Sequence, residues 1–239
     1  MESLPKRPAF PSTRWSRILA PGGEPDLDGL LKSYGGPIEA YLRARLRVGE
    51  HDAADVAQDA MLWILTSGLF AKADPARGRF RGLLKKALAN FAIDHLRRAT
   101  TERKGGGVRH APLDDAAGVA DPVAGPDRAL DDAWRRELLE RAYGRLCDEL
   151  QHGGRERYWQ VFRDYFLAGS PGGDQPTHQV LAARHGISRT DVSNWLDHAK
   201  RRFRAILREL VADTVMTPDE LDDELRWLFA GARTDGAGA

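Results

Sequence analysis

The segment from Arg77 to Arg109 restricts the fold of this chain more than any other feature of the sequence. It carries ten Lys or Arg residues against two acidic ones, a net charge of +8. Apolar residues recur through it at helical spacing, namely Phe80, Leu83, Leu84, Ala87, Leu88, Phe91, Ile93 and Leu96. The pattern predicts a helix with one apolar face to bury and one basic face to present. A solvated charged face is the simplest interpretation of such a helix. Whether the basic face instead binds a partner must be inferred from the rest of the chain.

The basic charge of the chain is unevenly distributed. Over all 239 residues the net charge is only +1. Residues 113–132, which follow the basic segment, have a net charge of −5, whereas residues 184–208 have a net charge of +5. Two separated basic blocks in a nearly neutral chain predict two contacts with one polyanion, such as a nucleic acid.

Length and composition narrow the class of protein. A chain of 239 residues suits one or two domains with buried cores. The single cysteine, Cys147, excludes an internal disulfide and a multi-cysteine metal site, and we expect it to be a core residue. The first residues lack the apolar core of a signal peptide, and the most apolar run, residues 60–71, is too short to cross a bilayer. We therefore expect a soluble, cytoplasmic protein without a membrane partner.

The periodicity predicts an all-α fold, because no stretch alternates apolar and polar residues convincingly with a period of two. The run Gly105-Gly106-Gly107 and Pro122 interrupt the helical pattern within a stretch rich in Gly, Ala, Pro and Asp. We expect two helical domains joined there by a flexible acidic linker. The predicted organisation is an N-terminal tail (1–26), a first helical domain (27–99), the linker (100–129), a second helical domain (130–212) and an acidic amphipathic extension (213–239).

Two helices are predicted before residue 50, from Leu27 to Tyr34 and from Pro37 to Val48, with a Gly-Gly pair between them. Asp52 to Ser67 should form the next helix. Three carboxylates share one of its faces, those of Asp52, Asp55 and Asp59. Such a group could hold a metal ion, but no histidine lies at matching spacing in this helix, so we expect neither a metal site nor a cofactor. A solvated face or a surface for a basic partner is the remaining interpretation.

Residues 178–208 show the pattern of a helix-turn-helix. Gly186 suits the left-handed position that ends a short first helix. Ser188 suits the N-cap of a long second helix that begins near Arg189. A small core would come from Leu181, Ile187, Val192 and Leu196, and Ala182 is small where the two helices must cross closely. A corner between two helices of an ordinary bundle is the alternative, and the basic residues along the second helix argue against it.

The first turns of that second helix would enter the major groove of DNA. The side chains that face the base edges would be those of Arg189, Thr190, Ser193 and Asn194. Arg184 and Lys200 would contact phosphates, which strengthens binding without selecting a sequence.

Three segments together resemble one protein family. Residues 52–65, D-A-A-D-V-A-Q-D-A-M-L-W-I-L, are similar to a helix with a D-hydrophobic-x-Q-[DE] core in bacterial RNA polymerase sigma factors of the extracytoplasmic-function (ECF) group. Residues 80–98, F-R-G-L-L-K-K-A-L-A-N-F-A-I-D-H-L-R-R, resemble the promoter-melting segment of that family. The helix-turn-helix after an acidic linker is the third match. Order and spacing agree over residues 27–98 and 130–211.

The resemblance implies an initiation factor that binds core RNA polymerase, recognises a promoter and helps to open it, and that is not itself an enzyme. Contacts with the β′ clamp helices would be made by Asp55, Gln58 and Asp59, and the second domain would contact the β flap. The minus-ten element would lie against Lys86, Asn90, Asp94, Arg97 and Arg98. The minus-thirty-five element would meet Arg184, Arg189, Thr190, Ser193, Asn194 and Lys200. An anti-sigma factor is a further partner that the family allows.

The chain departs from the family pattern at several positions. Leu83 stands where the family usually has tryptophan, which removes an aromatic ring on which a base could stack. Ser193 and Trp195 stand where basic residues are common in the recognition helix. Residues 169–176 form an insertion before the helix-turn-helix. The sequence preference of the recognition helix is therefore not implied by the resemblance.

A helix over residues 217–232 lies outside the resemblance. Thr217, Pro218 and Glu220 make a capping box with proline in the first turn. Apolar residues from Leu221 to Phe229 share one stripe of this otherwise acidic helix. It would pack on its own domain, or it would act as a built-in inhibitor that covers a basic surface.

Three other functions compete with the one that the resemblance implies. A stand-alone helix-turn-helix regulator would bind DNA without polymerase, but it leaves the acidic face of residues 52–59 and the segment 80–98 unexplained. An enzyme would need a glycine-rich phosphate loop, a Cys/His cluster or a nucleophile motif, none of which the sequence has. A helical adaptor, whose basic faces only keep it soluble, would show no salt-sensitive affinity for DNA.

Overall fold

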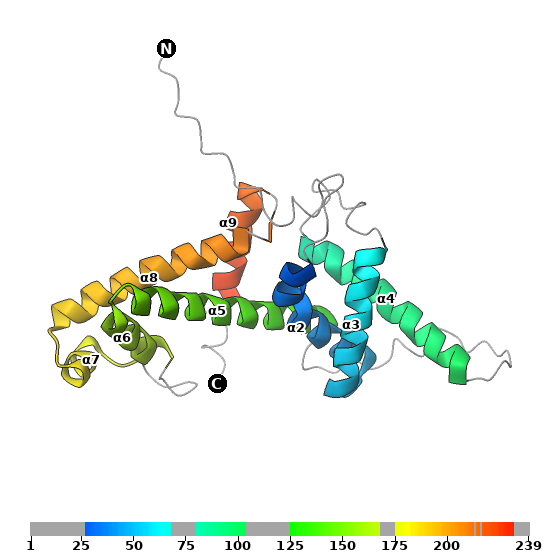
Figure 1. Cartoon of the computed structure of the whole chain (residues 1–239), viewed down its shortest axis with the longest axis horizontal. Helices are drawn as coiled ribbons and strands as arrows, with labels where there is room; N and C mark the ends of the chain where they lie inside the picture. The colour runs from blue at the N-terminus through cyan, green and yellow to red at the C-terminus, as the bar shows by residue number, and fades with distance from the viewer. Residues whose placement is uncertain are drawn as a thin grey trace, which may run out of the picture. The chain divides into compact units, whose positions relative to one another are not determined.

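The computed structural model describes residues 27–67, 80–103, 125–167, 175–212, 214–215 and 217–231 (Figure 1). Every regular element in these ranges is a helix, so the predicted all-α class is confirmed. The helices are α2 (Leu27–Leu46), α3 (Glu50–Thr66), α4 (Phe80–Arg103), α5 (Pro126–His152), α6 (Glu156–Phe166), α7 (His178–His185), α8 (Arg189–Ala212) and α9 (Pro218–Gly231). The predicted tail and most of the predicted linker lie outside the described residues.

The chain divides into two compact units, and the division falls inside α5. The N-terminal unit comprises residues 1–137 and 214–216, and the C-terminal unit comprises residues 138–213 and 217–239. About three turns of α5 therefore belong with α2, α3 and α4, whereas the rest of α5 belongs with α6 to α9. Helix α5 begins at Pro126, ahead of the predicted start of the second domain at residue 130.

Helix α2 is one helix, which corrects the prediction of two. Pro37 lies inside it and is buried, although a proline in a helix interior removes a backbone hydrogen bond and costs about 3 kcal/mol. Tyr34 and Ile38, on either side of it, are 1% and 0% exposed. Burying side chains of this size contributes roughly 1.5–3 kcal/mol each. The packing of α2 therefore outweighs the local signal of glycine and proline.

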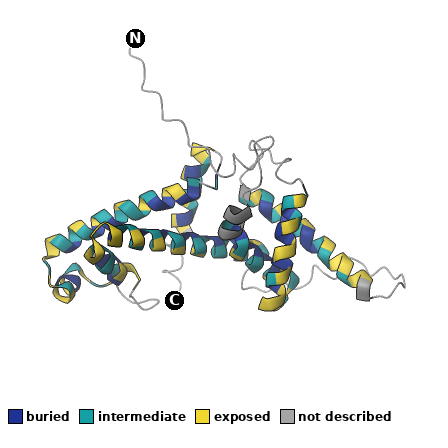
Figure 2. Cartoon of the chain, in the orientation of Figure 1, coloured by how far each residue is buried: buried dark blue, intermediate teal, exposed yellow. Residues whose placement is uncertain are grey.

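The buried faces of α2, α3 and α4 form the core of the N-terminal unit (Figure 2). In α3 the buried positions recur as helical periodicity requires, at Ala53, Val56, Ala57, Ala60, Met61 and Ile64. Helix α4 buries Leu84, Ala87, Leu88, Phe91 and Ala92. Three of its predicted apolar positions do not join this core, because Leu83 and Ile93 are half-buried and Leu96 is 44% exposed. One stripe of each of α3 and α4 is left accessible.

Helix α8 is the central helix of the C-terminal unit, since α6, α7 and α9 all pack against it. Buried side chains of this unit include Leu146, Val161, Phe162, Leu181, Val192, Leu196 and Ile206. Tyr143 of α5 stacks on Phe203 of α8 with ring centroids 4.7 Å apart. Glu149 of α5 accepts two hydrogen bonds from the guanidinium of Arg202. These bonds outweigh partial burial and hold the pKa of Glu149 below its ordinary value.

Helix α9 packs on α8 within the C-terminal unit. Thr217 accepts a hydrogen bond from the backbone N–H of Glu220 at 3.2 Å, which confirms its predicted capping role. Leu221 and Leu228 are buried, and Asp222 pairs with Arg208 of α8 at 3.1 Å. These contacts agree with the interpretation in which the segment packs on its own unit. Inhibition by α9 stays a hypothesis.

Replacing Ile64 by alanine should destabilise the N-terminal unit, because Ile64 is fully buried in α3 and its truncation leaves a cavity. We expect a loss of about 2–5 kcal/mol in the free energy of unfolding. Leu62→Ala, in the same helix but at a position that is 63% exposed, should change it by less than about 0.5 kcal/mol. Urea denaturation of the two variants measures the difference, and equal losses would contradict the burial pattern of α3.

Candidate functional site

The acidic face of α3 is accessible. Asp55, Gln58 and Asp59 lie at i, i+3 and i+4 and are all exposed. Leu62 continues the same stripe at i+7 and is 63% exposed, the highest value among the exposed large apolar side chains of the described residues. Sequence reasoning missed Leu62, although its spacing from Asp55 and its absence from the apolar face of α3 could have identified it. We define Asp55, Gln58, Asp59 and Leu62 as the α3 stripe.

The residues of α4 that the resemblance assigns to the minus-ten element are also accessible. All five are exposed and recur on one side of the helix, and they define the α4 stripe: Lys86, Asn90, Asp94, Arg97 and Arg98. A guanidinium nitrogen of Arg97 lies 3.6 Å from the carboxylate of Asp94. Arg98 donates a long hydrogen bond, 3.4 Å, to the backbone oxygen of Asp94. Because both contacts are at the exposed surface, they leave the two guanidinium groups open to a ligand.

The basic residues of α4 are divided between two faces, which corrects the expectation of a single basic face. Arg81 and Lys85 lie outside the α4 stripe, where both pair with Asp131 of α5. The side chains of Arg81 and Lys85 are 12% and 21% exposed. A carboxylate of the chain itself therefore holds one set of basic residues, while the α4 stripe faces solvent.

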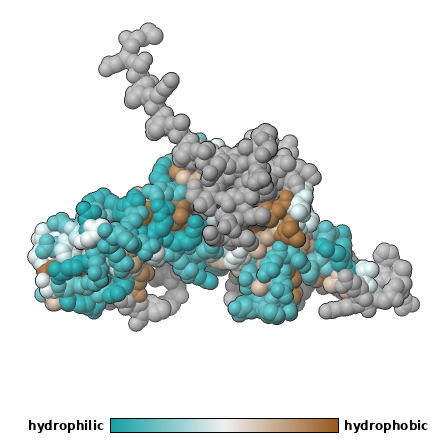
Figure 3. Space-filling model, viewed as in Figure 1, coloured by the Kyte–Doolittle hydropathy of each residue, from teal (hydrophilic) through white to brown (hydrophobic). Residues whose placement is uncertain are grey.

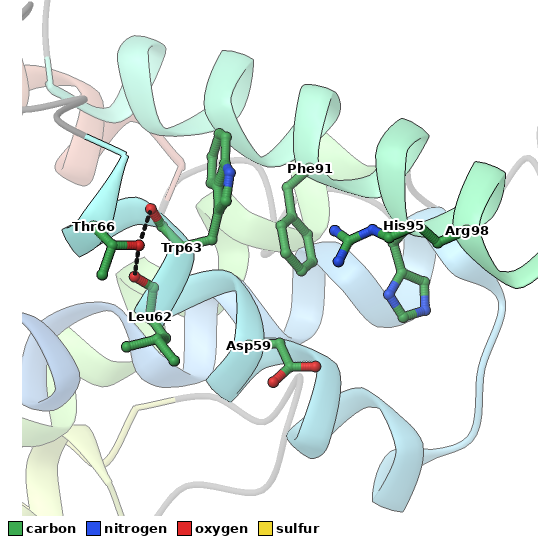
Figure 4. Close-up of a pocket in the computed structure, with 7 residues that line it drawn as sticks. All are labelled: Asp59, Leu62, Trp63, Thr66, Phe91, His95 and Arg98. Carbon is green, nitrogen blue, oxygen red and sulfur yellow. Dashed lines mark hydrogen bonds between the residues drawn. The ribbon is translucent and has the colours of Figure 1, made fainter.

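An open groove of about 310 Å³ lies between α3 and α4 (Figure 4). Trp63 projects into it from α3, and Phe91 and His95 project from α4. The ring centroids of Trp63 and Phe91 are 5.8 Å apart, and those of Phe91 and His95 are 6.1 Å apart. The remaining lining residues are Asp59, Leu62, Thr66 and Arg98. The groove thus brings together Asp59, assigned to the polymerase, and Arg98, assigned to DNA.

A tight turn with a cap on each side connects α7 to α8. Gly186 has φ 62° and ψ 42°, the left-handed conformation that ends α7. Ser188 accepts a hydrogen bond from the N–H of Asp191 at 3.0 Å, and the Asp191 carboxylate accepts one from the N–H of Ser188 at 3.2 Å. The capping roles predicted for Gly186 and Ser188 are confirmed. At the other end of α7, Thr177 accepts from the N–H of Val180 at 3.3 Å.

The first turns of α8 present polar side chains. Arg189, Thr190 and Asn194 are exposed, whereas Ser193 is half-buried. Figure 3 shows a mostly hydrophilic surface over α8 in that view. Lys200, farther along α8, lies with Nζ 5.1 Å from the ring centroid of Tyr165 and 5.5 Å from that of Phe166, both in α6. These cation–π contacts hold Lys200 against α6, so it is less free to meet a phosphate than the sequence predicts.

Trp195 of α8 contacts two side chains of α6. It stacks on Tyr158 with ring centroids 4.8 Å apart, and the guanidinium of Arg157 lies 5.4 Å from its ring centroid. Arg157 also donates a hydrogen bond of 2.7 Å to the backbone oxygen of His185, at the end of α7. Trp195 therefore joins α8 to α6. Neither Arg157 nor Tyr158 carries a local sequence signal for this contact.

Asp164 of α6 anchors α7. Its carboxylate lies 3.1 Å from Nε2 of His185 and 3.5 Å from Nη1 of Arg184, and it accepts hydrogen bonds of 2.9 and 3.1 Å from Arg163. Burial raises the pKa of Asp164, but the bonds and charges of these basic groups outweigh burial, and the pKa lies below its ordinary value. Arg184, assigned to phosphate contact, therefore also holds α7 in place.

Comparisons with protein-family models, with curated proteins and with solved structures gave no match for this chain. In the part of the chain that the structure describes, no helix has the length and apolar character needed to cross a membrane. In the same residues, no cluster of three or more His, Cys, Asp or Glu side chains is arranged to hold a metal ion. The α3 stripe, the α4 stripe and the turn between α7 and α8 are the features that a functional assignment must explain.

The lowered pKa of Asp164 makes a prediction about acid stability. A carboxylate with a depressed pKa in the folded state stabilises it above the ordinary pKa and loses this effect as the pH falls. Asp164→Asn should therefore cost about 1–3 kcal/mol at neutral pH and should flatten the pH dependence of unfolding below about pH 4. Urea denaturation of wild type and variant across this range measures both effects. A variant as stable as wild type at neutral pH would contradict the anchoring role.

Proposed function

We propose that this chain is a sigma-like transcription initiation factor of the cytoplasm. It binds core RNA polymerase, recognises the minus-ten and minus-thirty-five elements of a promoter and promotes strand opening, while the polymerase supplies the chemistry. The observation that carries the proposal is the pair of accessible stripes on neighbouring helices of the N-terminal unit, acidic on α3 and largely basic on α4. The resemblance of the sequence assigns the first to a protein and the second to DNA.

The charge of the α3 stripe favours a protein partner over a nucleic acid. Asp55 and Asp59 repel phosphates at short range, so a protein that only binds DNA has no use for them. Leu62 adds an exposed apolar side chain at the end of the stripe, and protein interfaces combine an apolar centre with a polar rim. The partner proposed for this stripe is the β′ clamp of core RNA polymerase, through complementary basic side chains.

The α4 stripe has the side chains that contact with a DNA strand requires. Lys86, Arg97 and Arg98 are exposed cations that can neutralise phosphates. Asn90, between them on the same stripe, offers both a donor and an acceptor to a base edge. In the proposal, the minus-ten element lies along this stripe and its opened strand is held there, which shifts the equilibrium of the promoter toward strand separation.

The C-terminal unit serves as the second domain in this proposal. The capped pair α7 and α8 acts as a helix-turn-helix, and Arg189, Thr190 and Asn194 enter the major groove of the minus-thirty-five element. Ser193, which is half-buried, contributes less than the sequence suggests. The same unit contacts the β flap, and the acidic linker passes near the RNA exit path.

Reversing the charge of the α3 stripe should abolish binding to polymerase. We expect wild type to co-purify stoichiometrically with bacterial core RNA polymerase. The variant Asp55→Arg/Asp59→Arg should fail to co-purify, since its new positive charges would repel a complementary basic surface on the polymerase. The matched control is Glu140→Arg/Asp148→Arg, which makes the same charge change at two exposed positions of α5. Leu62→Ala should weaken binding with little change in stability.

The outcomes of this experiment separate the candidate functions. Binding lost in the α3 variant and kept in the α5 control supports the polymerase contact of α3. Binding that survives in both variants would contradict that contact. A wild-type chain that ignores core polymerase but binds duplex DNA in a salt-sensitive way would instead be a stand-alone helix-turn-helix regulator.

The α8 assignment predicts two different effects of mutation on duplex binding. Asn194→Ala should reduce discrimination at one base position by about 1–3 kcal/mol, or roughly 5- to 150-fold, while affinity for random DNA changes little. Arg184→Ala should weaken binding to all sequences and lower the salt dependence by about 0.9 in slope. Affinity measured against a selected site and its single-base variants tests both. An Asn194→Ala variant with unchanged discrimination would remove this residue from base recognition.

A further inference from the structure

The first turns of α5 attach to α4 through one carboxylate within the N-terminal unit. Oδ1 of Asp131 accepts a hydrogen bond from Nη1 of Arg81 at 2.9 Å, and Oδ2 accepts one from Nζ of Lys85 at 2.8 Å. The three side chains are 22%, 12% and 21% exposed. Both oxygens of one carboxylate are therefore used, each by a different cation, in a site that is mostly shielded from water.

The first turns of α5 are also held by apolar packing, in addition to the ion pairs of Asp131. Leu130 is 0% exposed and Trp134 is 2% exposed. The guanidinium of Arg81 lies 4.7 Å from the ring centroid of Trp134, which adds a cation–π contact to the ion pair. Farther along, a Cβ on Gly36 of α2 would lie only 3.2 Å from Oε2 of Glu137. The packed part of α5 in this unit thus extends from Leu130 to Glu137.

The chemistry of this site is that of an oxyanion receptor. An arginine and a lysine one helical turn apart, both directed at one pair of oxygens, bind a phosphate as readily as a carboxylate. Among the α4 side chains that the structure describes, the exposed cations Lys86, Arg97 and Arg98 are on the α4 stripe and have no ion pair with Asp131. Arg81 and Lys85 are therefore a second cationic site on the same helix, and its present occupant is the chain itself.

We propose that Arg81 and Lys85 bind a phosphate of a DNA strand, and that Asp131 occupies this site in the free chain. The inference rests on the proposed function in one respect, that DNA lies along α4. A phosphate that replaces Asp131 exchanges one ion pair for another, so the exchange itself costs little. Asp131 competes with the phosphate because it belongs to the same chain and is held in place by the buried side chains of Leu130 and Trp134. DNA and the first turns of α5 consequently exclude each other on this face of α4.

The test compares full-length wild type with Asp131→Asn in binding a fluorescent single-stranded oligonucleotide, followed by anisotropy. The apparent affinity of a covered site is its intrinsic affinity multiplied by the fraction of time that the site is open. Because Asp131→Asn removes the carboxylate that covers the site, we expect this variant to bind DNA roughly tenfold more tightly than wild type. One additional neutralised phosphate should steepen the salt dependence by about 0.7 in slope. Asp131→Glu keeps a carboxylate at this position and should bind as wild type does.

Asp132→Asn is the matched control, because it makes the same change of charge at the next residue of the same helix. Asp132 pairs with Arg128 and Arg135 of its own helix. We expect its DNA affinity to stay within roughly twofold of wild type, as for a change in net charge alone. If Asp131→Asn and Asp132→Asn bind DNA equally well, the proposal is wrong.

A chemical footprint tests the cover without DNA. The rate at which an amine-reactive reagent acetylates Lys85, relative to its exposed neighbour Lys86, reports whether Lys85 is shielded. We expect this ratio to rise severalfold in Asp131→Asn. Because Lys86 itself lies on the α4 stripe, the effect of single-stranded DNA is read from the acetylation rate of Lys85 alone, which we expect to fall when DNA is added. An unchanged ratio in Asp131→Asn would show that Asp131 does not shield Lys85, and a rate at Lys85 that DNA fails to lower in this variant would show that no phosphate binds there.

Measuring polymerase binding alongside these assays distinguishes a failure of this inference from a failure of the proposed function. A chain that fails to bind core polymerase, but whose Asp131→Asn variant gains DNA affinity and Lys85 reactivity, would refute the initiation factor and support the covered phosphate site. A chain that binds polymerase, but whose Asp131→Asn variant behaves as Asp132→Asn does, would refute the covered site alone.

Discussion

Carboxylates of α5 restrain a basic helix in each of the two units. In the N-terminal unit, Asp131 holds Arg81 and Lys85 of α4. In the C-terminal unit, Glu149 holds Arg202 of α8. Such partly buried, charge-assisted pairs are stronger than exposed ones because water screens them less. The basic charge of the sequence is therefore only partly available to a polyanion, because carboxylates of α5 pair with Arg81, Lys85 and Arg202.

Amphipathic helices explain how one small unit can carry two surfaces of opposite charge. Each of α3 and α4 buries an apolar stripe in a common core, and this fixes the direction in which the other stripe points. The α3 and α4 stripes meet at the groove lined by Trp63, Asp59 and Arg98. Partners on the two stripes would therefore be neighbours, and substitutions in the groove should affect both.

Local signals predicted local structure well. Gly186, Ser188 and Thr217 act within three or four residues of their hydrogen-bond partners, so residue type and spacing alone identified their roles. The all-α class followed from periodicity in the same way. The spacing of polar residues also predicted that Asp55, Gln58 and Asp59 of α3 and the residues of the α4 stripe would be exposed, because burial of one helix face determines the other.

Several failures of prediction involve contacts between residues far apart in sequence. Asp131 meets Lys85 and Arg81 across 46 and 50 residues, and no local pattern indicates that two cations of α4 are taken. Pro37 was read as the start of a helix, but packing on both sides keeps α2 continuous. Lys200 lies near the rings of Tyr165 and Phe166, more than thirty positions away, a contact that no local pattern indicates, and its contact with a phosphate stays a prediction.

The most direct test of the central claim is to map transcript 5′ ends made by bacterial core RNA polymerase on a library of genomic DNA fragments, with and without this chain. The account predicts start sites that depend on the chain and share two upstream sequence elements at fixed spacing. It also predicts that Asp55→Arg/Asp59→Arg abolishes these starts. The absence of any chain-dependent start site, from a chain that is folded and binds duplex DNA, would contradict the account.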